Sequence, residues 1–251
     1  RRHVGQGYGQ FWRGIIFDRE YKALDDILAK TKRHFPKFGD GAKFLSGQGQ
    51  YTWKWPTGEE LLFRVMKNPD DYLKYHGQEY PFIGFNELTK YPTADCYELI
   101  QSCNRSSFIP SKHSPDLANP LPDIPLEVVS TTIPSGPGHN WVKRRFIDAA
   151  PDGKIVRKRS LVFNPRTQKE EIVVKTQVSI FSSYKENIYL PPEYVADLQN
   201  ITDPNKRAAW LEGDWDVTAG GALDDLWDSK VHVLDRFEAP KSWRLTRSFD
   251  W

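Results

Sequence analysis

Tyr80-Pro81-Phe82-Ile83-Gly84-Phe85-Asn86-Glu87-Leu88 is the stretch that decides the fold class of this chain. Its apolar run ends abruptly in two polar residues, a pattern typical of a buried strand in a parallel sheet. Asn86 and Glu87 would then lie at the carboxyl end of the strand, where open α/β sheets form their ligand crevice. Taken alone, the stretch fits an ordinary core strand followed by a polar turn at least as well.

A second short run has the same design. Residues 126–132 carry Leu126, Val128 and Val129 and end in polar residues that include Thr131 and Thr132, which predicts another short buried strand. The polar ends of two such strands can converge on one crevice, which favours an α/β nucleotide-binding sheet. A carboxylate such as Glu87, placed there beside Mg²⁺ and a nucleotide phosphate, is what an ATPase needs to orient an attacking water.

The sequence up to residue 153 supplies further elements for such a sheet. Alternating or apolar runs predict strands at 15–17, 43–45, 50–55 and 60–66. Helices are expected at 21–35, where apolar residues recur at helical spacing, and at 70–75, 94–103 and 139–147. The segment 108–125 is rich in Pro, Ser and Asn and is expected to be a surface loop.

The pattern of the sequence changes at residue 154. Residues 155–163 and 171–180 alternate between apolar and polar side chains, which predicts an antiparallel pair of strands. Helices are expected to begin near residue 191 and to run over 204–211. Gly220-Gly221 is interpreted as a linker, and two strand-like runs follow it, at 231–237 and 243–250.

The composition sets limits on the class of protein. With 251 residues, 39% of them hydrophobic, the chain suits one large domain or one domain with a small appendage. The formal net charge of +2 permits nucleic-acid binding without arguing for it. No apolar stretch approaches the roughly 20 residues that span a bilayer, so we expect a soluble protein with no membrane partner. Cys96 and Cys103 are expected to be reduced thiols, with no zinc or disulfide role.

Several motifs, taken in chain order, resemble those of the large terminase subunits of tailed bacteriophages, which package viral DNA. Each motif alone is weak, and the resemblance rests on the ordered set, which spans nearly the whole chain. The matching segments are Gly5-Gln6-Gly7-Tyr8-Gly9 with Trp12-Arg13-Gly14, Tyr75-His76-Gly77 before 80–87, Thr131-Thr132 before 136–143, Leu190-Pro191-Pro192-Glu193-Tyr194, Leu211-Glu212-Gly213-Asp214-Trp215 and Arg247-Ser248-Phe249-Asp250-Trp251.

The resemblance implies an α/β fold with three parts. These are an ASCE-type P-loop ATPase core at residues 1–153, a small α+β lid subdomain at 154–216, and a linker with the first strands of an RNase H-like nuclease at 217–251. On that map the chain begins after the Walker A loop and ends on the first nuclease aspartate. We therefore expect both ends to continue into further sequence.

The resemblance also assigns roles to residues at the strand ends. Glu87 matches the catalytic glutamate, which polarises the water that attacks the γ-phosphate of ATP. Asn86 matches an aspartate that supports Mg²⁺ through water; the amide keeps one oxygen acceptor but loses the charge, so we expect weaker metal binding. Thr131 and Thr132 match the coupling motif that reports the phosphate state to the lid, although Ile133 stands where the family usually has Asn.

Two further residues take roles from the resemblance. Arg105 has a position suited to an arginine finger that acts on a neighbouring subunit, and a surface arginine is the alternative. Asp250 matches a carboxylate of a two-metal nuclease that uses Mg²⁺ or Mn²⁺, but its partner carboxylates would lie outside this chain. We therefore expect no DNA cleavage from this chain by itself.

Two basic clusters are candidates for DNA contact. Clusters of this kind grip phosphates without reading sequence, which suits a motor that moves along any DNA. A solvated basic face is the alternative interpretation. The clusters are Lys143, Arg144 and Arg145, and Arg157, Lys158 and Arg159.

Together these expectations describe the ATPase of a motor that uses ATP and Mg²⁺ to translocate double-stranded DNA into a procapsid. Its expected partners are the DNA, the portal protein, the small terminase subunit and further copies of itself in a ring. It would act in the host cytoplasm and transiently on the viral procapsid. The alternatives are a helicase-like ASCE ATPase, and a catalytically silent module that binds DNA or partners.

Overall fold

A computed structural model describes residues 7–47 and 50–217, together with isolated positions beyond residue 230. Asp250, the linker at Gly220-Gly221 and most of the strand-like sequence after residue 230 lie outside the described residues. The metal-binding role of Asp250 therefore stays a prediction.

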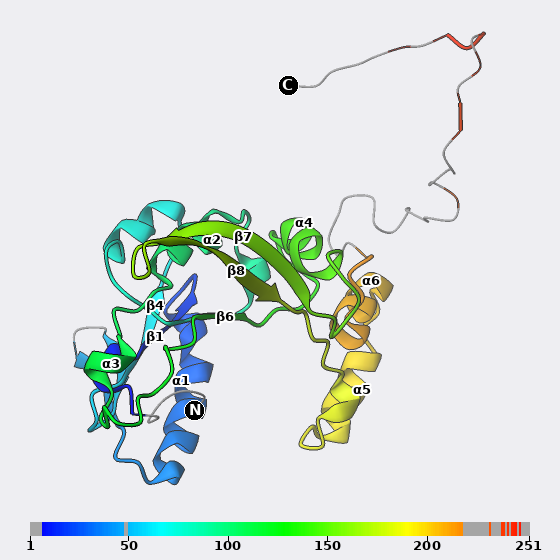
Figure 1. Ribbon diagram of the computed structural model, residues 1–251. Helices are drawn as coiled ribbons and strands as arrows, with labels where there is room; N and C mark the ends of the chain where they lie inside the picture. The colour runs from blue at the N-terminus through cyan, green and yellow to red at the C-terminus, as the bar shows by residue number, and fades with distance from the viewer. Residues whose placement is uncertain are drawn as a thin grey trace.

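The centre of the molecule is a six-stranded, mostly parallel sheet (Figure 1). In their order across the sheet, the strands are β2 (Lys43–Leu45), β3 (Tyr51–Lys54), β4 (Glu60–Val65), β1 (Arg13–Asp18), β5 (Phe82–Phe85) and β6 (Glu127–Ser130). The last four are parallel to one another, whereas β2 and β3 extend the sheet in antiparallel fashion beside β4. This confirms the predicted α/β fold class.

β5 occupies an interior position in the sheet because its side chains can be buried on both faces. Ile83 and Phe85 are buried in the core on one face, and Phe82, on the other face, is partly buried against the second core. Gly84 lets β1 approach closely, since a Cβ atom there would lie only 2.9 Å from Cγ1 of Ile16. The strand pairs with β1 on one side and β6 on the other, in parallel on both. The prediction of a buried parallel strand is confirmed.

β6 corrects one expectation, because the run at 126–132 was predicted to be buried. Within the described part of the chain β6 pairs only with β5 and forms one edge of the sheet. Val129 is accordingly 44% exposed, and the other three residues of the strand are half-buried. Two consecutive apolar residues, Val128 and Val129, cannot by themselves distinguish an edge strand from an interior one.

Successive residues of β4 show how the two faces of the sheet are covered. Leu62 packs into a core with residues of α2 (Asp95–Ile100). Its neighbours Leu61 and Phe63 point to the opposite face and pack into a core with residues of α1 (Asp25–His34). This alternation of side chains along a strand gives a sheet with helices on both faces.

Most predicted helices are present, and three segments differ in type. The segment 70–75 is the 3-10 helix η5 (Pro69–Lys74), and 139–147 is a one-turn α4 (His139–Val142) continued by the π-helix η8 (Lys143–Ile147). The expected loop contains a short helix, α3 (Pro110–His113). The remaining short helices of the core and its extensions are η1 (Gly9–Phe11), η2 (Lys22–Leu24), η3 (Phe35–Phe38), η6 (Leu88–Lys90), η7 (Gln101–Cys103) and η9 (Tyr184–Glu186).

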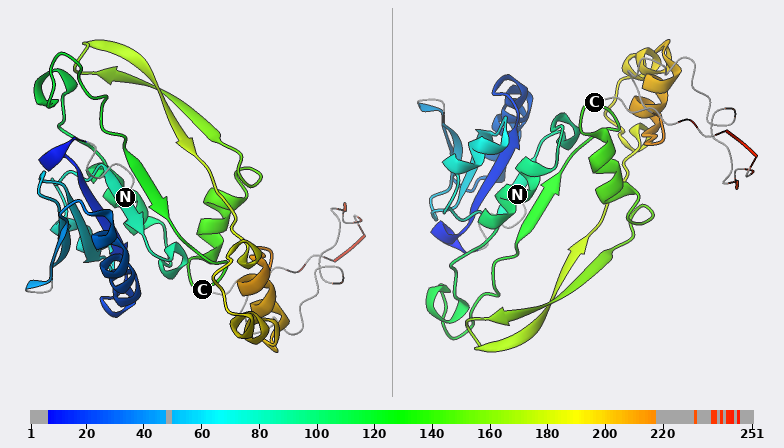
Figure 2. Two further views of the ribbon diagram at one scale, coloured as in Figure 1. Left: turned by 90° about the horizontal axis from the view of Figure 1, so that it is seen from below. Right: turned by 90° about the horizontal axis from the view of Figure 1, so that it is seen from above.

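A long two-stranded ribbon follows the core. It joins β7 (Val156–Asn164) to β8 (Lys169–Gln177) in antiparallel fashion, which confirms the prediction for this segment. Figure 2 shows that the ribbon arches past the β6 side of the core and meets it at its two ends. At the tip, Arg166 Nη1 lies 3.1 Å from the Asp123 carboxylate. Most side chains between the two ends are exposed.

A small helical group comes after the ribbon. It contains α5 (Pro192–Gln199) and α6 (Pro204–Arg207), which is continued by the π-helix η10 (Ala208–Glu212). Both α-helices begin with proline, whose fixed φ suits the first helical position. The carbonyl oxygen of Trp215 lies 3.1 Å from His139 Nε2 and connects this group to α4. Among the described residues, no helix has the length and apolar character needed to cross a membrane.

Two substitutions test this description of the sheet. Replacing Phe85, which is 2% exposed, with Ala removes a central side chain and is expected to lower the free energy of unfolding by about 3–5 kcal/mol. Replacing Val129 with Ala is expected to cost less than about 1 kcal/mol, because this side chain lies on an exposed edge strand. Urea denaturation measures both values, and equal losses would contradict the edge position of β6.

Candidate functional site

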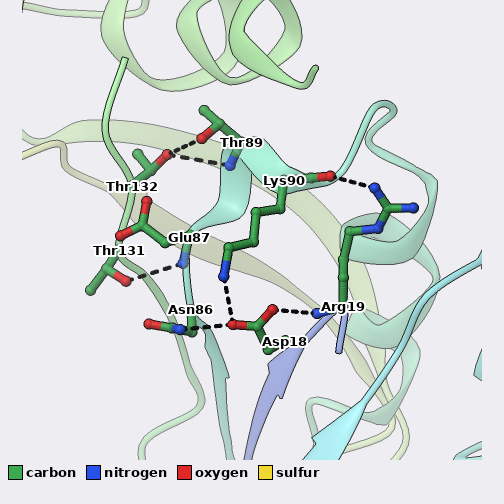
Figure 3. Close-up of polar contacts among 8 residues, drawn as sticks. All are labelled: Asp18, Arg19, Asn86, Glu87, Thr89, Lys90, Thr131 and Thr132. Atoms are coloured by element: carbon green, nitrogen blue, oxygen red, sulfur yellow. Dashed lines mark hydrogen bonds and ion pairs between the residues drawn. The ribbon is translucent and has the colours of Figure 1, made fainter. Parts of the chain in front are cut away.

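The parallel strands β1, β5 and β6 end side by side, and their carboxyl ends bring polar side chains together (Figure 3). The ladder continues past the strands, because the N–H of Asn86 donates to a β1 carbonyl at 2.9 Å and the N–H of Thr131 donates to a β5 carbonyl at 3.0 Å. The residues at these strand ends, called here the strand-end cluster, are Asp18, Asn86, Glu87, Lys90 and Thr131.

The Asp18 carboxylate is buried in the strand-end cluster and receives three donors. Its side chain is only 1% exposed. Oδ2 accepts from Asn86 Nδ2 at 2.8 Å and from Lys90 Nζ at 2.8 Å. Oδ1 accepts from the backbone N–H of Arg19 at 2.6 Å. A buried carboxylate needs partners of this kind, because its removal from water is otherwise costly.

Neither Asp18 nor Lys90 was among the site residues predicted from the sequence. A signal for Asp18 was present, since it is the polar residue that follows the apolar run at 15–17, as Asn86 follows the run at 80–85. Lys90 reaches the cluster because the helix η6 turns the chain back after β5 and places its ammonium against Asp18. No local pattern in the sequence predicts that contact.

Glu87 has an unusual backbone conformation. Its φ of 56° lies in the left-handed region, which costs a non-glycine residue about 1–3 kcal/mol. Two hydrogen bonds hold it there: the N–H of Glu87 donates to Thr131 Oγ1 at 3.3 Å, and the N–H of Leu88 donates to the carbonyl oxygen of Thr131 at 2.8 Å. Strain that the surroundings maintain in this way clusters at functional sites.

The carboxyl group of Glu87 is half-buried, and burial raises its pKa above the ordinary value. The Lys90 ammonium and a hydrogen bond from the backbone of Ile133 act in the opposite direction. Ile133 therefore reaches Glu87 through its main chain, although its side chain differs from the expected Asn. A carboxylate with a raised pKa is better suited to take a proton at neutral pH.

Thr132 connects the turn after β6 to the turn that follows Glu87. Its Oγ1 accepts from the N–H of Thr89 at 3.3 Å and donates to Oγ1 of Thr89 at 3.0 Å. Thr89 Oγ1 also donates to the carbonyl oxygen of Ile133 at 3.3 Å. With the bonds of Thr131 already described, the structure brings both predicted coupling threonines against the segment after β5.

Arg105 lies near the amino end of β5, whereas Glu87 follows its carboxyl end. Its Nη2 donates to the carbonyl oxygen of Gly77 at 2.8 Å, and its Nε lies 3.8 Å from the Glu79 carboxylate, both just before β5. Gly9 also lies away from the strand-end cluster, since it precedes β1 and its N–H donates to a carboxylate oxygen of Glu59 at 3.2 Å. Neither residue joins the strand-end cluster within one chain.

In the first predicted DNA-binding cluster, two side chains form ion pairs within the chain and the third is exposed. Lys143 Nζ lies 3.1 Å from the Asp216 carboxylate. Arg145 Nη1 lies 2.6 Å from the Glu98 carboxylate. Arg144 is exposed. Lys143 and Arg145 thus stabilise contacts between elements of this chain.

The second predicted DNA-binding cluster is exposed along β7 but does not form one patch. Side chains alternate along a strand, so Arg157 and Arg159 share one face of the ribbon and Lys158 lies on the other. Lys158 is directly opposite Lys175 in the register. A single flat phosphate surface could therefore contact only part of this cluster.

A cavity of about 540 Å³ lies over β2, β3 and β4, away from the strand-end cluster. Its lining includes Arg13, Lys54, Glu60 and Arg64. Glu60 lies 3.3 Å from both Arg13 Nε and Lys54 Nζ, so two of these cations already have a counter-ion. The chemistry expected from the sequence is at the strand ends, and we take these as the candidate site.

The strand-end cluster suits a divalent cation only together with other ligands. Among the described residues, no group of three His, Cys, Asp or Glu side chains is placed to hold a metal. The cluster does offer side-chain oxygens from Asn86 and Glu87, and oxygen is the ligand that Mg²⁺ prefers. Magnesium keeps several waters and is commonly held by one or two protein groups plus substrate phosphates. The residues present fit that mode of binding.

The fold is similar to that of a solved large terminase. One similar structure is the large terminase from a thermophilic bacteriophage in complex with ADP (TM-score 0.55, 14% identity), and another is the same phage terminase in a second crystal form (TM-score 0.54, 14% identity). Each comparison covers 93% of this chain and 47% of the terminase, so the chain spans about half the length of these structures. The sequence matches no protein-family model and no curated protein. The likeness establishes a terminase-like fold.

The raised pKa of Glu87 predicts a pH-dependent stability difference. Folding favours the protonated acid, so the contribution of Glu87 to stability is present below pH 4.5 and is lost as the pH rises through the higher folded-state value. Glu87→Gln is therefore expected to be more stable than the natural chain at pH 7 and about equal to it at pH 4. Thermal unfolding at both pH values measures this. The exposed Glu170→Gln serves as the control, and an identical response of both variants would contradict the prediction.

Proposed function

We propose that this chain is the ATP-hydrolysing part of a motor that moves double-stranded viral DNA into a procapsid. The observation that carries the proposal is the position of Glu87. Its half-buried carboxyl group, with a raised pKa, lies at the carboxyl ends of the strands in a terminase-like sheet. In such sheets the ligand binds outside the carboxyl ends of the strands.

The proposed substrate is ATP with Mg²⁺. The structure of the thermophilic-phage terminase contains ADP, which supports an adenine nucleotide as the ligand of this fold. Magnesium, when bound, would neutralise charge on the phosphate oxygens. On the protein side, Asn86 and Glu87 supply the oxygens that face such a group, and they come from the two positions that follow β5.

Glu87 is proposed to orient the attacking water and accept its proton. The rate of such a step depends on holding the base in one geometry, and the bonds from Thr131 and Ile133 restrict the Glu87 backbone and carboxylate. Burial raises the pKa of Glu87 toward the operating pH, which improves proton transfer.

The turn after Glu87 offers a route by which hydrolysis would be passed to the lid. The N–H of Gly138 donates to the carbonyl oxygen of Thr89 at 2.8 Å, and Trp141 Nε1 donates to that of Tyr91 at 2.7 Å. A Cβ atom at Gly138 would lie 2.1 Å from the Tyr91 oxygen, so only glycine permits this contact. α4 thus rests on the turn, and through His139 it contacts the segment that follows α6.

DNA and the other partners of the motor enter the proposal as expectations from the resemblance. Arg144, Arg157 and Arg159 are exposed and remain available for phosphate contact. Arg105 is exposed near the amino end of β5, so it would act as an arginine finger only on a neighbouring copy in a ring. Nuclease activity, the portal protein, the small terminase subunit and the host cytoplasm belong to the same proposal.

A silent binding module is the second candidate, and Asn86 favours it. An amide in place of a carboxylate lowers the negative charge that a magnesium nucleotide would meet. A chain that binds DNA or partners without turnover would tolerate that change.

ATP hydrolysis by the chain, together with any residues that its gene encodes on either side, distinguishes these candidates. Glu87→Gln keeps the size and one oxygen of the side chain but removes the base, and is expected to lower kcat by about 10²-fold or more. Glu170→Gln, an exposed change on the ribbon, is expected to leave kcat unaltered. Absence of hydrolysis in the natural protein and in Asn86→Asp would favour the binding module.

A further inference from the structure

The Asn86 side chain has a carboxylate as its hydrogen-bond partner. Asp18 lies in the neighbouring strand, and its Oδ2 is 2.8 Å from Asn86 Nδ2. We propose that Asp18 and Asn86 act as a pair, in which the Asp18 carboxylate, ion-paired with Lys90, orients the Asn86 amide so that Oδ1 serves as the ligand for a nucleotide-bound divalent cation. This inference rests on the proposed function and names Asp18 as a positioning residue within it.

The orientation of the Asn86 amide follows from the partners of Asp18. A carboxylate oxygen accepts hydrogen bonds, so the side of the amide that faces it must be the NH₂ group. Lys90 Nζ and the N–H of Arg19 donate to the same carboxylate, which confirms that Asp18 acts only as an acceptor here. If the Asn86 amide were turned round, its oxygen would oppose a carboxylate oxygen, and that arrangement is repulsive.

The free end of the amide faces away from Asp18. Figure 3 shows Asn86 Oδ1 on the side of Thr131, away from the carboxylate. Within the part of the chain that the structure describes, no hydrogen bond to Oδ1 is formed, whereas Nδ2 donates to Asp18. The pair therefore presents an oxygen acceptor, the kind of atom that a hard divalent cation binds.

A carboxylate behind a ligand has an established physical effect. It fixes the orientation of the ligand and makes it more basic, and its loss typically costs about 10–100-fold in metal affinity. Here the ligand is an amide, which has a single useful orientation, so the dependence on Asp18 is strong.

Asp18 and Asn86 are also complementary in a way that excludes a carboxylate at both positions. Asn86→Asp alone would place two carboxylates within hydrogen-bonding distance of each other, and Lys90 is the one ammonium that contacts Asp18 among the described residues. The same reasoning predicts that exchanging the two residues, in Asp18→Asn with Asn86→Asp, preserves one carboxylate, one amide and the bond between them.

The test compares the natural protein with Asp18→Asn, Asn86→Asp and the exchanged double variant, in the chain with any residues that its gene encodes on either side. The probe is Mn²⁺ with ADP, and free Mn²⁺ is followed by electron paramagnetic resonance. Asp18→Asn is expected to weaken Mn²⁺ binding about 10–100-fold, Asn86→Asp is expected not to strengthen it, and the double variant is expected to restore it.

Thermal unfolding without metal and the side-chain amide signal of Asn86 in NMR provide readouts independent of hydrolysis. Both single variants are expected to be less stable than the natural protein and the double variant to recover. A shift of the Asn86 amide signal in Asp18→Asn is expected, with the signal assigned by its loss in Asn86→Asp. A purely structural Asp18 would change stability and leave Mn²⁺ affinity unaltered.

The outcomes separate this inference from the proposed function. If Glu87→Gln abolishes hydrolysis while Asp18→Asn binds Mn²⁺ normally, the pairing is wrong and the ATPase stands. If Mn²⁺ binding depends on Asp18 in a protein that hydrolyses no ATP, the pairing stands and the ATPase is wrong. Tighter Mn²⁺ binding by Asn86→Asp alone, or no Mn²⁺ binding by the natural protein, would overturn the pairing.

Discussion

The in-register parallel pairing of β5 with β1 and β6 is the constraint on which the candidate site depends. Phe85 lies opposite Phe17 on one side and Ser130 on the other, so the three strands reach the same edge together. A shift of β5 by one residue would turn its side chains to the opposite faces and place a residue with a Cβ atom where Gly84 now faces Ile16. It would also separate Asn86 from Asp18. The buried apolar side chains of the sheet therefore hold the polar residues of the strand-end cluster in place.

The pattern of apolar and polar residues along single segments was sufficient to predict several parts of the fold and of the site. The strand at β5, the Glu87 carboxylate at its end and Thr131 after the next parallel strand all follow from apolar runs that stop at polar residues. The antiparallel ribbon follows from alternation in the same way. Burial of β6 was not predictable, because it depends on how many strands pair with it and not on its own residues.

Long-range pairing explains what the sequence could not show. Asp18 and Asn86 are 68 residues apart, and only the order of strands in the sheet makes them neighbours. Lys143 has the sequence context of a DNA-binding lysine, yet it pairs with Asp216 from a distant segment. A basic residue in a cluster is therefore a weak indicator of nucleic-acid contact until its carboxylate partners are known. Lys158 is a different case, because the alternation of the predicted strand is by itself enough to place it on the face opposite Arg157 and Arg159.

The turn after β5 combines backbone strain, a partly buried carboxyl group and close contact with another element. Glu87 has a left-handed conformation, and Gly138 approaches the same turn too closely for any side chain. The left-handed conformation of Glu87 and the burial of its carboxyl group cost stability, and the bonds from Thr131 and Thr132 maintain the turn. A ligand that bound the Glu87 carboxylate would offset part of that cost. The stability of the turn would then depend on whether the ligand is bound. Because α4 rests on this turn, such a change would reach the segments that follow the core without any new contact between them.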